Sequence, residues 1–337
     1  MALLTLATAG CGRPLRFPLT AGAAFEFSAY FQEDISGVAR AALAAGRRLI
    51  RTIYPVWYEV DAAGNISDLG YDAEVQRTAA DAGIAVVPVV RNRVVPGSDP
   101  AALVRNRRTA QAAAARLASL AAGRGFHGLN IDFTGLPADA GDELLSFCRD
   151  LWRRLHGLGK RLVITLPARP DRSAAEVAAY NYRQLSRVAD FIILAAYDHS
   201  SAVTAPGPVA PLAWVERSIA DVTRVVPANK VILAVGAYGY DWPTGGPGLP
   251  AAVSAAGAYQ LASQVSATVS FDAAAHEETF SYSQAGMNRI VWFGDRRSVS
   301  ERIALARACG LYGVVCWRLG QEEAGFWDAV KQALRGK

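Results

Sequence analysis

The sequence predicts an α/β fold in which eight parallel strands close into a (β/α)8 barrel, with a small α+β insertion between strands 7 and 8. The chain alternates apolar, β-rich runs with Ala-, Leu- and Arg-rich stretches of helical period. The apolar runs are continuous, which is typical of parallel strands buried on both faces. A length of 337 residues is enough for one large domain with a well-buried core.

The eight expected strands are Glu26–Phe31, Leu49–Trp57, Ala85–Asn92, Gly128–Phe133, Arg161–Ala168, Phe191–Asp198, Val231–Tyr238 and Gly313–Trp317. The helices expected between them are Ile35–Ala45, Asp72–Ala82, Pro100–Arg124, Ala138–Leu158, Ala174–Val188, Ala213–Val225 and Ser298–Cys309. A single helix separates most pairs of strands, and this is the pattern of a parallel sheet that closes on itself.

The connection between the seventh and eighth strands is too long for one crossover helix. A Pro/Gly turn at residues 243–247 precedes one short helical segment and three strand-like pieces. These pieces are Ala258–Val265, Ala267–Phe271, Thr279–Ser283 and Met287–Phe293. We therefore expect an N-terminal segment over residues 1–24, a barrel over 25–337 and an insertion at about 241–297 that forms one wall of a cleft.

Composition and charge narrow the classes of partner and cofactor. The formal net charge is +5, and the arginines are scattered in a way that is typical of solvated helix faces. Because no zinc-finger spacing or basic stripe is present, a nucleic-acid partner is not expected. None of the four cysteines forms a Cys-x-x-Cys pair, so a structural metal site is not expected. Nothing in the sequence implies a metal or an organic cofactor. We expect a monomer.

Within the N-terminal segment, residues 2–10 form an apolar run with small residues toward its end, and the run stops at Cys11. It resembles the end of a bacterial lipoprotein signal, in which such a cysteine is lipidated after cleavage. No Lys or Arg precedes the short run, which is unlike a complete signal. Two interpretations stay open: a frayed N-terminus, or export with a lipid anchor at Cys11. The second predicts an extracellular or cell-envelope location.

The stretch at residues 126–137 is the most informative part of the sequence. On a strand, alternate side chains share a face, so Asn130, Asp132 and Thr134 are expected to point into the barrel. Three polar side chains in a barrel interior are costly unless they are hydrogen-bonded or used. In barrels of this type the reactive residues lie at the C-terminal ends of the strands. A hydrogen-bonded polar layer is the alternative interpretation.

This stretch resembles the signature Asp-Gly-x-Asp-x-Asp-x-Glu of family 18 glycoside hydrolases, which are TIM barrels. The match places His127, Asn130 and Asp132 at the three Asp positions and Thr134 at the Glu position. It is closest to the branch of spore-cortex hydrolases and of barrels fused to deacetylases or glycosyltransferases.

Other segments follow the family in order, over roughly residues 25 to 330. They are Ala196-Tyr197-Asp198, Pro206–Ala210, Tyr238-Gly239-Tyr240-Asp241-Trp242, Val291-Trp292-Phe293 and Trp317-Arg318-Leu319-Gly320.

The resemblance implies substrate-assisted cleavage of an N-acetylhexosamine-containing polysaccharide or oligosaccharide. In that chemistry the 2-acetamido carbonyl of the sugar attacks its own anomeric carbon, and a Glu protonates the departing oxygen. The resemblance makes Asp132 the carboxylate that orients the acetamido group, with Tyr197 and Asp198 as its partners on the sixth strand, and Trp317 the floor under the sugar. The remaining substrate-binding positions would be Asn130, Tyr238, Tyr30 and Glu33.

Departures from the family pattern gather around the same cleft. A threonine hydroxyl at 134 cannot act as a general acid near neutral pH, and loss of such an acid costs about 10² to 10⁴ in rate. Residues 199–201 are His-Ser-Ser where the related branch has Glu-His-Trp, and Glu33 stands where an aromatic residue is common.

Three functions remain open. The first is a chitinase-like pseudoenzyme that binds peptidoglycan, chitin-like glycan or exopolysaccharide with lost or much reduced hydrolysis. The second is an active glycosidase or transglycosylase with a relocated acid, for which Glu33 is the leading candidate. Glu59, Asp198 and Asp241 are the other carboxylates expected near strand ends. The third is a structural envelope scaffold, since fold alone does not fix function.

Overall fold

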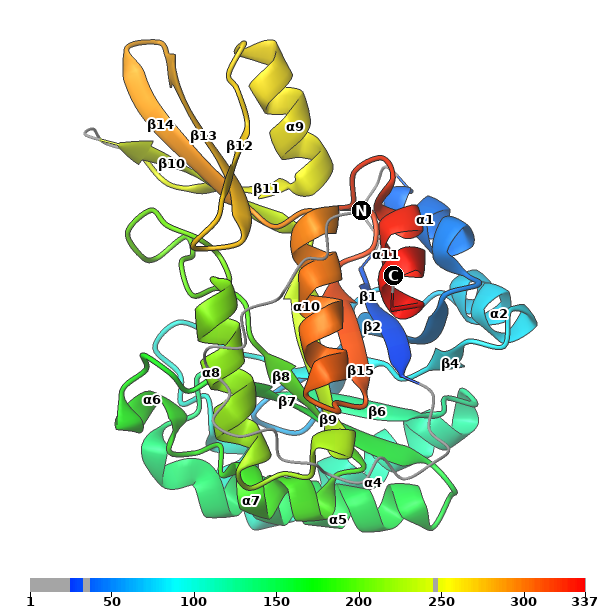
Figure 1. Ribbon diagram of the computed structural model, residues 1–337. Coiled ribbons are helices and arrows are strands. Elements are labelled where there is room, and N and C mark those ends of the chain that lie inside the picture. The colour runs from blue at the N-terminus through cyan, green and yellow to red at the C-terminus, as the bar shows by residue number, and fades with distance from the viewer. Residues whose placement is uncertain (1–24, 33–36, 245–247, 337) are drawn as a thin grey trace.

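The computed structural model describes residues 25–32, 37–244 and 248–336, and its centre is the expected closed parallel barrel (Figure 1). Strand β1 pairs with both β15 and β2, which closes the ring. In spatial order the barrel strands are β1 (Glu26–Phe31), β15 (Gly313–Trp317), β9 (Val231–Gly236), β8 (Phe191–Ala195), β7 (Arg161–Pro167), β6 (Gly128–Asp132), β5 (Val89–Asn92) and β2 (Ile50–Val60).

Several strand ends differ from the expected ranges. The expected strand Ala85–Asn92 is divided into β4 (Ala85–Val86) and β5, with Pro88 between them. Proline has no N–H to give to a sheet ladder, so it interrupts the run. Strand β2 continues to Val60 because it forms a hairpin with β3 (Ile66–Asp68). Strands β6 and β8 end one and three residues earlier than expected.

Helices cover the outside of the barrel, and two of the expected helices are broken. The helices of the barrel are α1 (Val38–Gly46), α2 (Ala73–Asp81), α3 (Ala102–Arg105), α4 (Arg107–Gly123), α5 (Gly141–His156), α6 (Ala174–Val177), α7 (Tyr182–Leu185), α8 (Leu212–Thr223), α10 (Arg296–Ala308) and α11 (Phe326–Leu334). Short 3-10 turns occur at Ala138–Ala140, Ser186–Val188 and Ala228–Lys230.

Side-chain caps explain where the two expected helices break. Asn106 ends α3 and begins α4, because its side chain accepts a hydrogen bond from the Thr109 N–H at 3.1 Å. Asn181 caps α7 in the same way through the Gln184 N–H at 3.1 Å. Among the described residues, no helix is both long and apolar enough to cross a membrane.

The buried core has two parts. A large shell fills the space between the barrel strands and the covering helices. A smaller cluster fills the barrel interior and consists of Tyr30, Tyr54, Val56, Val87, Val89, Val163, Ile193, Ile232, Ala234 and Val315. Apolar residues on both sides of the same strands account for the continuous apolar runs in the sequence.

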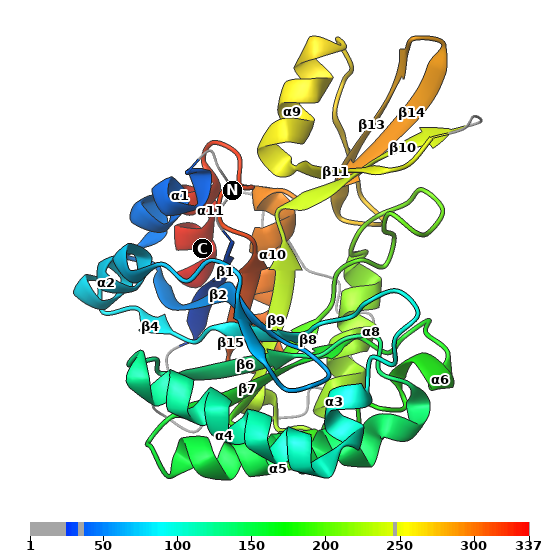
Figure 2. The same cartoon turned by 180° about the vertical axis from the view of Figure 1, so that it is seen from behind.

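Between β9 and β15 the chain forms a five-stranded sheet and a helix that project beyond the barrel (Figures 1 and 2). The elements are β10 (Tyr238–Thr244), β11 (Ala251–Ser254), α9 (Ala255–Gln264), β12 (Ser270–Asp272), β13 (Glu277–Gln284) and β14 (Met287–Phe293). The sheet order is β11-β10-β14-β13-β12. The expected hairpin is present, since β13 and β14 pair antiparallel around the turn after Gln284.

The two faces of this sheet have different partners. One face packs against α9, where the Tyr259 and Phe293 rings are 5.2 Å apart. The other face contributes to a small apolar cluster that reaches the barrel, made of Val209, Tyr238 and Trp242 with Tyr240, Ile290, Trp292 and Trp317. The sheet therefore forms a wall directly beside the barrel mouth.

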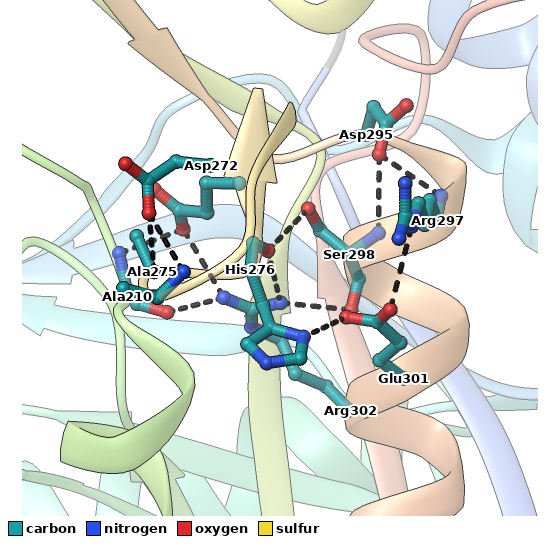
Figure 3. Close-up of polar contacts among 11 residues, drawn as sticks. Ala210, Asp272, Ala275, His276, Asp295, Arg297, Ser298, Glu301 and Arg302 are labelled. Carbon is teal, nitrogen blue, oxygen red and sulfur yellow. Dashed lines mark hydrogen bonds and ion pairs between the residues drawn. The ribbon is translucent and has the colours of Figure 1, made fainter. Parts of the chain in front are cut away.

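A buried ion pair, which we call the clamp, fastens this wall to the barrel (Figure 3). Glu277 on β13 and Arg302 on α10 are 3.2 Å apart and almost fully buried. The Glu277 carboxylate also accepts the N–H groups of Val209 and Ala210, at 2.7 and 2.8 Å. Arg302 donates to the carbonyl oxygens of Ala210 and Ser298. The clamp thus joins three elements: the wall, α10 and the loop between β8 and α8.

Candidate functional site

Aromatic and charged side chains gather at the C-terminal ends of the barrel strands, around Trp317. The Trp317 ring lies 5.0 Å from the Tyr30 ring and 6.4 Å from the Tyr197 ring. The guanidinium of Arg91 lies 5.7 Å from the same ring. These residues come from β1, β5, β15 and the segment after β8, so the fold brings together positions that are far apart in sequence.

Asn130 lies inside the barrel and is fully buried. Its Oδ1 accepts a hydrogen bond from the Thr165 hydroxyl at 3.1 Å, and that hydroxyl lies 3.4 Å from the Tyr30 hydroxyl. The Asn130 Nδ2 has no hydrogen-bond partner among the described residues. An unpaired buried donor is costly, so this layer is polar and incompletely satisfied.

Asp132 is the last residue of β6 and lies opposite Arg91 of β5 in the strand register. The nearest atoms, Arg91 Nε and Asp132 Oδ2, are 3.9 Å apart, and 18% of the Asp132 side chain is exposed. Burial raises the pKa of Asp132, and the charge of Arg91 opposes that rise only in part. Asp132 is therefore a mostly buried carboxyl group at the barrel mouth.

Tyr197 and Asp198 follow β8 and link the mouth to the wall. Burial raises the pKa of Tyr197 well above its ordinary value, and the charges of Asp132 and Asp198 add to the rise. Asp198 accepts hydrogen bonds from the hydroxyl groups of Tyr238 and Tyr240, at 2.5 and 3.0 Å. Asp198 therefore holds two tyrosines of the wall.

Thr134 corrects one expectation from the sequence. Strand β6 ends at Asp132, so Thr134 does not share a strand face with Asn130 and Asp132. It is exposed, and its backbone N–H and carbonyl are both bonded to the side chain of Asn92, at 2.9 Å each. The segment is thus fixed beside the mouth by Asn92, which the sequence did not single out.

The carboxylates considered as a replacement for the missing acid have different surroundings. Glu33, like Cys11, lies outside the described residues. Asp241 lies in the wall and is held by Arg289 at 2.9 Å and by the Tyr282 hydroxyl at 2.7 Å. Glu59 lies 3.6 Å from Arg93. The Asp241 carboxylate is already saturated by these partners, which makes it a structural group.

Arg91 is the important residue that the sequence analysis missed. It stands at the end of the apolar run Val86–Val90, directly before Asn92. A charged residue at the C-terminal end of a predicted barrel strand is a signal that could have identified it. Together, Asp132, Arg91, Tyr197 and Trp317 offer a charged pair beside aromatic faces, which suits a ligand that has both polar and apolar surfaces.

Comparison with known proteins places these residues in a family context. The sequence model for glycosyl hydrolases family 18 matches residues 99–322. The putative sporulation-specific glycosylase YdhD of Bacillus subtilis is 33% identical over 199 residues, or 58% of this chain and 47% of that protein. The cortical fragment-lytic enzyme of the same organism is 33% identical over 207 residues. The chain spans about half the length of these two relatives.

Solved structures share the fold. A chitinase from Chromobacterium violaceum is 28% identical with a TM-score of 0.83, over 92% of this chain and 99% of that one. The B. subtilis YdhD structure is 28% identical with a TM-score of 0.74, over 79% and 90%. The Bacillus cereus spore cortex-lytic enzyme SleL, at 20% identity, has a TM-score of 0.84 over 92% and 74%.

Proposed function

This chain belongs to glycosyl hydrolases family 18, and from that premise we propose that it binds an N-acetylated glycan at the barrel mouth with lost or much reduced hydrolysis. Its relatives include a chitinase and a cortical fragment-lytic enzyme, and we infer chitin-like glycan or peptidoglycan as the class of ligand. In this proposal Asp132 orients the acetamido group, Tyr197 holds its carbonyl oxygen and Trp317 forms the floor under the sugar.

The observation that carries the proposal is the contrast between Asp132 and Thr134. Asp132 is mostly buried and lies in one cluster with Arg91 and Trp317. Thr134, which we infer to occupy the position of the family's acid, bears no ionisable group. A sugar could be held by such a site, but its leaving oxygen would receive no proton from residue 134.

Two measurements test the proposal. Titration calorimetry with chitotetraose should show binding to the unmodified chain, while product analysis on chitin oligosaccharides and peptidoglycan should show hydrolysis near background. Thr134→Glu should raise hydrolysis by about 10² to 10⁴ because it restores a carboxylic acid beside Asp132. Thr78→Glu, an exposed change on α2 at the barrel exterior, is the matched control and should leave hydrolysis at background.

Other outcomes would redirect the proposal. Absence of chitotetraose and peptidoglycan-fragment binding would favour a protein-interaction scaffold. Efficient cleavage by the unmodified chain, abolished by Glu33→Gln, would establish a relocated acid.

We also propose that the protein acts outside the cytoplasm or at the cell envelope, where such glycans are found. Fractionation of cells that express the chain with Cys11 intact or changed to Ser tests this location and the lipid anchor.

A further inference from the structure

We propose that Arg91 makes the mouth selective for acidic glycans, namely N-acetylated oligosaccharides that carry a carboxylate on a sugar bound beside Trp317. This inference rests on the proposed function, because it specifies the ligand of the same site. The two proposals make different predictions. Binding of a neutral glycan would support the proposed function, whereas the proposed role of Arg91 predicts that a negatively charged glycan binds more tightly than a neutral one.

The position of Arg91 is the first argument. Its guanidinium lies near both the Asp132 carboxylate, at 3.9 Å, and the Trp317 ring, at 5.7 Å. These are the two residues that would hold the acetamido group and form the floor, so Arg91 lies within reach of a bound sugar. The Arg91 side chain is 37% exposed, which leaves part of it open to solvent at the mouth.

The second argument is that the hydrogen-bonding capacity of Arg91 is unused. At 3.9 Å the contact with Asp132 is longer than a hydrogen bond. In the part of the chain that the structure describes, no acceptor lies within hydrogen-bond distance of the Arg91 guanidinium. A guanidinium has five N–H donors in a planar fork that matches a carboxylate, so a carboxylated sugar would supply the missing acceptors.

The balance of charge at the mouth is the third argument. Asp198 is already occupied by the hydroxyl groups of Tyr238 and Tyr240. Thr134 is neutral, whereas a glutamate there would repel an anionic ligand. Asp132 is the one carboxylate among the described residues within ion-pair distance of Arg91. A negatively charged group of the ligand that approaches Arg91 from the side away from Asp132 would therefore be attracted by the guanidinium charge. The attraction is stronger in a partly desolvated site than in bulk water.

A purely structural role for Arg91 makes a different prediction. If Arg91 only neutralises and orients Asp132, its loss would weaken neutral and acidic glycans by the same factor. If Arg91 binds a ligand carboxylate, its loss would weaken only the acidic ones. The ratio of the two affinities therefore separates the roles, and protein stability does not enter that ratio.

The experiment measures Kd by calorimetry for chitotetraose and for two acidic probes. One probe is an N-acetylated tetrasaccharide with lactyl-ether carboxylates on alternate sugars, and the other alternates N-acetylhexosamine with uronic acid. Each acidic probe is compared with its methyl ester, which has nearly the same shape and no charge. The two probes distinguish the two sources of the carboxylate.

For the unmodified chain, at least one acid should bind about 10- to 100-fold more tightly than its ester, the range expected for a hydrogen bond to a charged group. Arg91→Gln should reduce that ratio to near one. Arg91→Lys should restore part of it, because the charge returns without the planar fork. The acid preference should also fall as salt is raised.

Arg93→Gln is the matched control, since Arg93 follows on the same segment, is 54% exposed and pairs with Glu59. It should leave every ratio unchanged. Equal binding of acid and ester by the unmodified chain would overturn the inference while chitotetraose binding still upheld the proposed function. Equal weakening of all probes in Arg91→Gln would also overturn it. Failure of every probe to bind would reject the proposed function itself.

Discussion

Two arginine–carboxylate pairs in this molecule have opposite surroundings. In the clamp, Arg302 and Glu277 are almost fully buried, and both members have further hydrogen bonds to the backbone. At the mouth, Arg91 and Asp132 are 3.9 Å apart and partly exposed. Among the described residues, hydrogen bonds to the protein do not satisfy the remaining donors of Arg91 and acceptors of Asp132. The clamp is a finished structural unit, whereas the mouth has polar capacity left for a ligand.

The difference teaches how to separate structural charges from functional ones. A buried ion pair repays its desolvation only when hydrogen bonds satisfy its remaining donors and acceptors, as the clamp does. An incompletely satisfied charged pair is tolerated where function requires it, and Asp132 and Tyr197, whose pKa values burial raises, lie at that place. Substitutions in the two regions should therefore affect different measurements.

The largest effect is expected from breaking the clamp. Arg302→Met leaves the Glu277 carboxylate buried without its cation, which should lower the free energy of unfolding by about 3 to 5 kcal/mol. Arg154→Met removes an exposed helical pair with Asp150 and should cost only about 0.3 to 0.5 kcal/mol. Urea unfolding followed by tryptophan fluorescence measures both. A cost for Arg302→Met no larger than for the control would erase the contrast between the regions.

The next largest effect is expected on glycan affinity when Trp317 at the barrel mouth is changed. Trp317→Ala removes the proposed aromatic floor, and loss of a central aromatic contact typically costs about 2 kcal/mol or more, roughly 30-fold in Kd. The measurement is calorimetry with chitotetraose. Trp152→Ala is the matched control, because that ring packs on His156 at the surface of α5. Unchanged affinity in Trp317→Ala would mean that the sugar lies elsewhere.

The smallest effect is expected from Asp132→Asn, which should change protein stability and glycan binding in opposite directions. Because the folded-state pKa of Asp132 is raised, ionising it lowers the free energy of unfolding as pH rises through that pKa. Asp132→Asn should therefore stabilise the fold at neutral pH, while glycan binding weakens on the order of tenfold as a charged hydrogen bond is lost.

Binding to the unmodified chain should weaken as pH falls through the raised pKa, above the ordinary value of 3.8. In Asp132→Asn this part of the pH dependence should disappear. Unfolding and calorimetric titrations from pH 4 to 8 would test both statements, and destabilisation at neutral pH by Asp132→Asn would contradict the first.

Local sequence patterns predicted the barrel because its strands are buried on both faces and separated by helices. The closed ring, the projecting wall and the hairpin around Gln284 were all expected and are confirmed. Helix breaks at Asn106 and Asn181 were not expected, because a capping asparagine competes with helical periodicity over only a few residues. Strand β6 ends at Asp132 and not at Phe133 as expected, so the alternation of Asn130 and Asp132 does not continue to Thr134.

The clamp and Arg91 could not be found in the same way. Glu277 and Arg302 are separated by 25 residues, and each resembles an ordinary surface charge in sequence. Their burial depends on how the wall meets α10, which is a tertiary fact. The order of the motifs led us to expect Asp132, Tyr197 and Trp317 in one site. In the structure the Tyr197 and Trp317 rings are 6.4 Å apart, and the charge of Asp132 raises the pKa of Tyr197, so the three residues are near one another.

The junction between β9 and β10 has a consequence for recognition. A single residue, Ala237, separates the two strands, and its N–H donates to the Trp317 carbonyl while its own carbonyl accepts from Ala255. The strand that carries Trp317 and the wall are thereby hydrogen-bonded to the same residue, which restrains the wall at its junction with the barrel. A site restrained in this way is preorganised, so little of the binding free energy is lost in ordering the protein when a ligand binds.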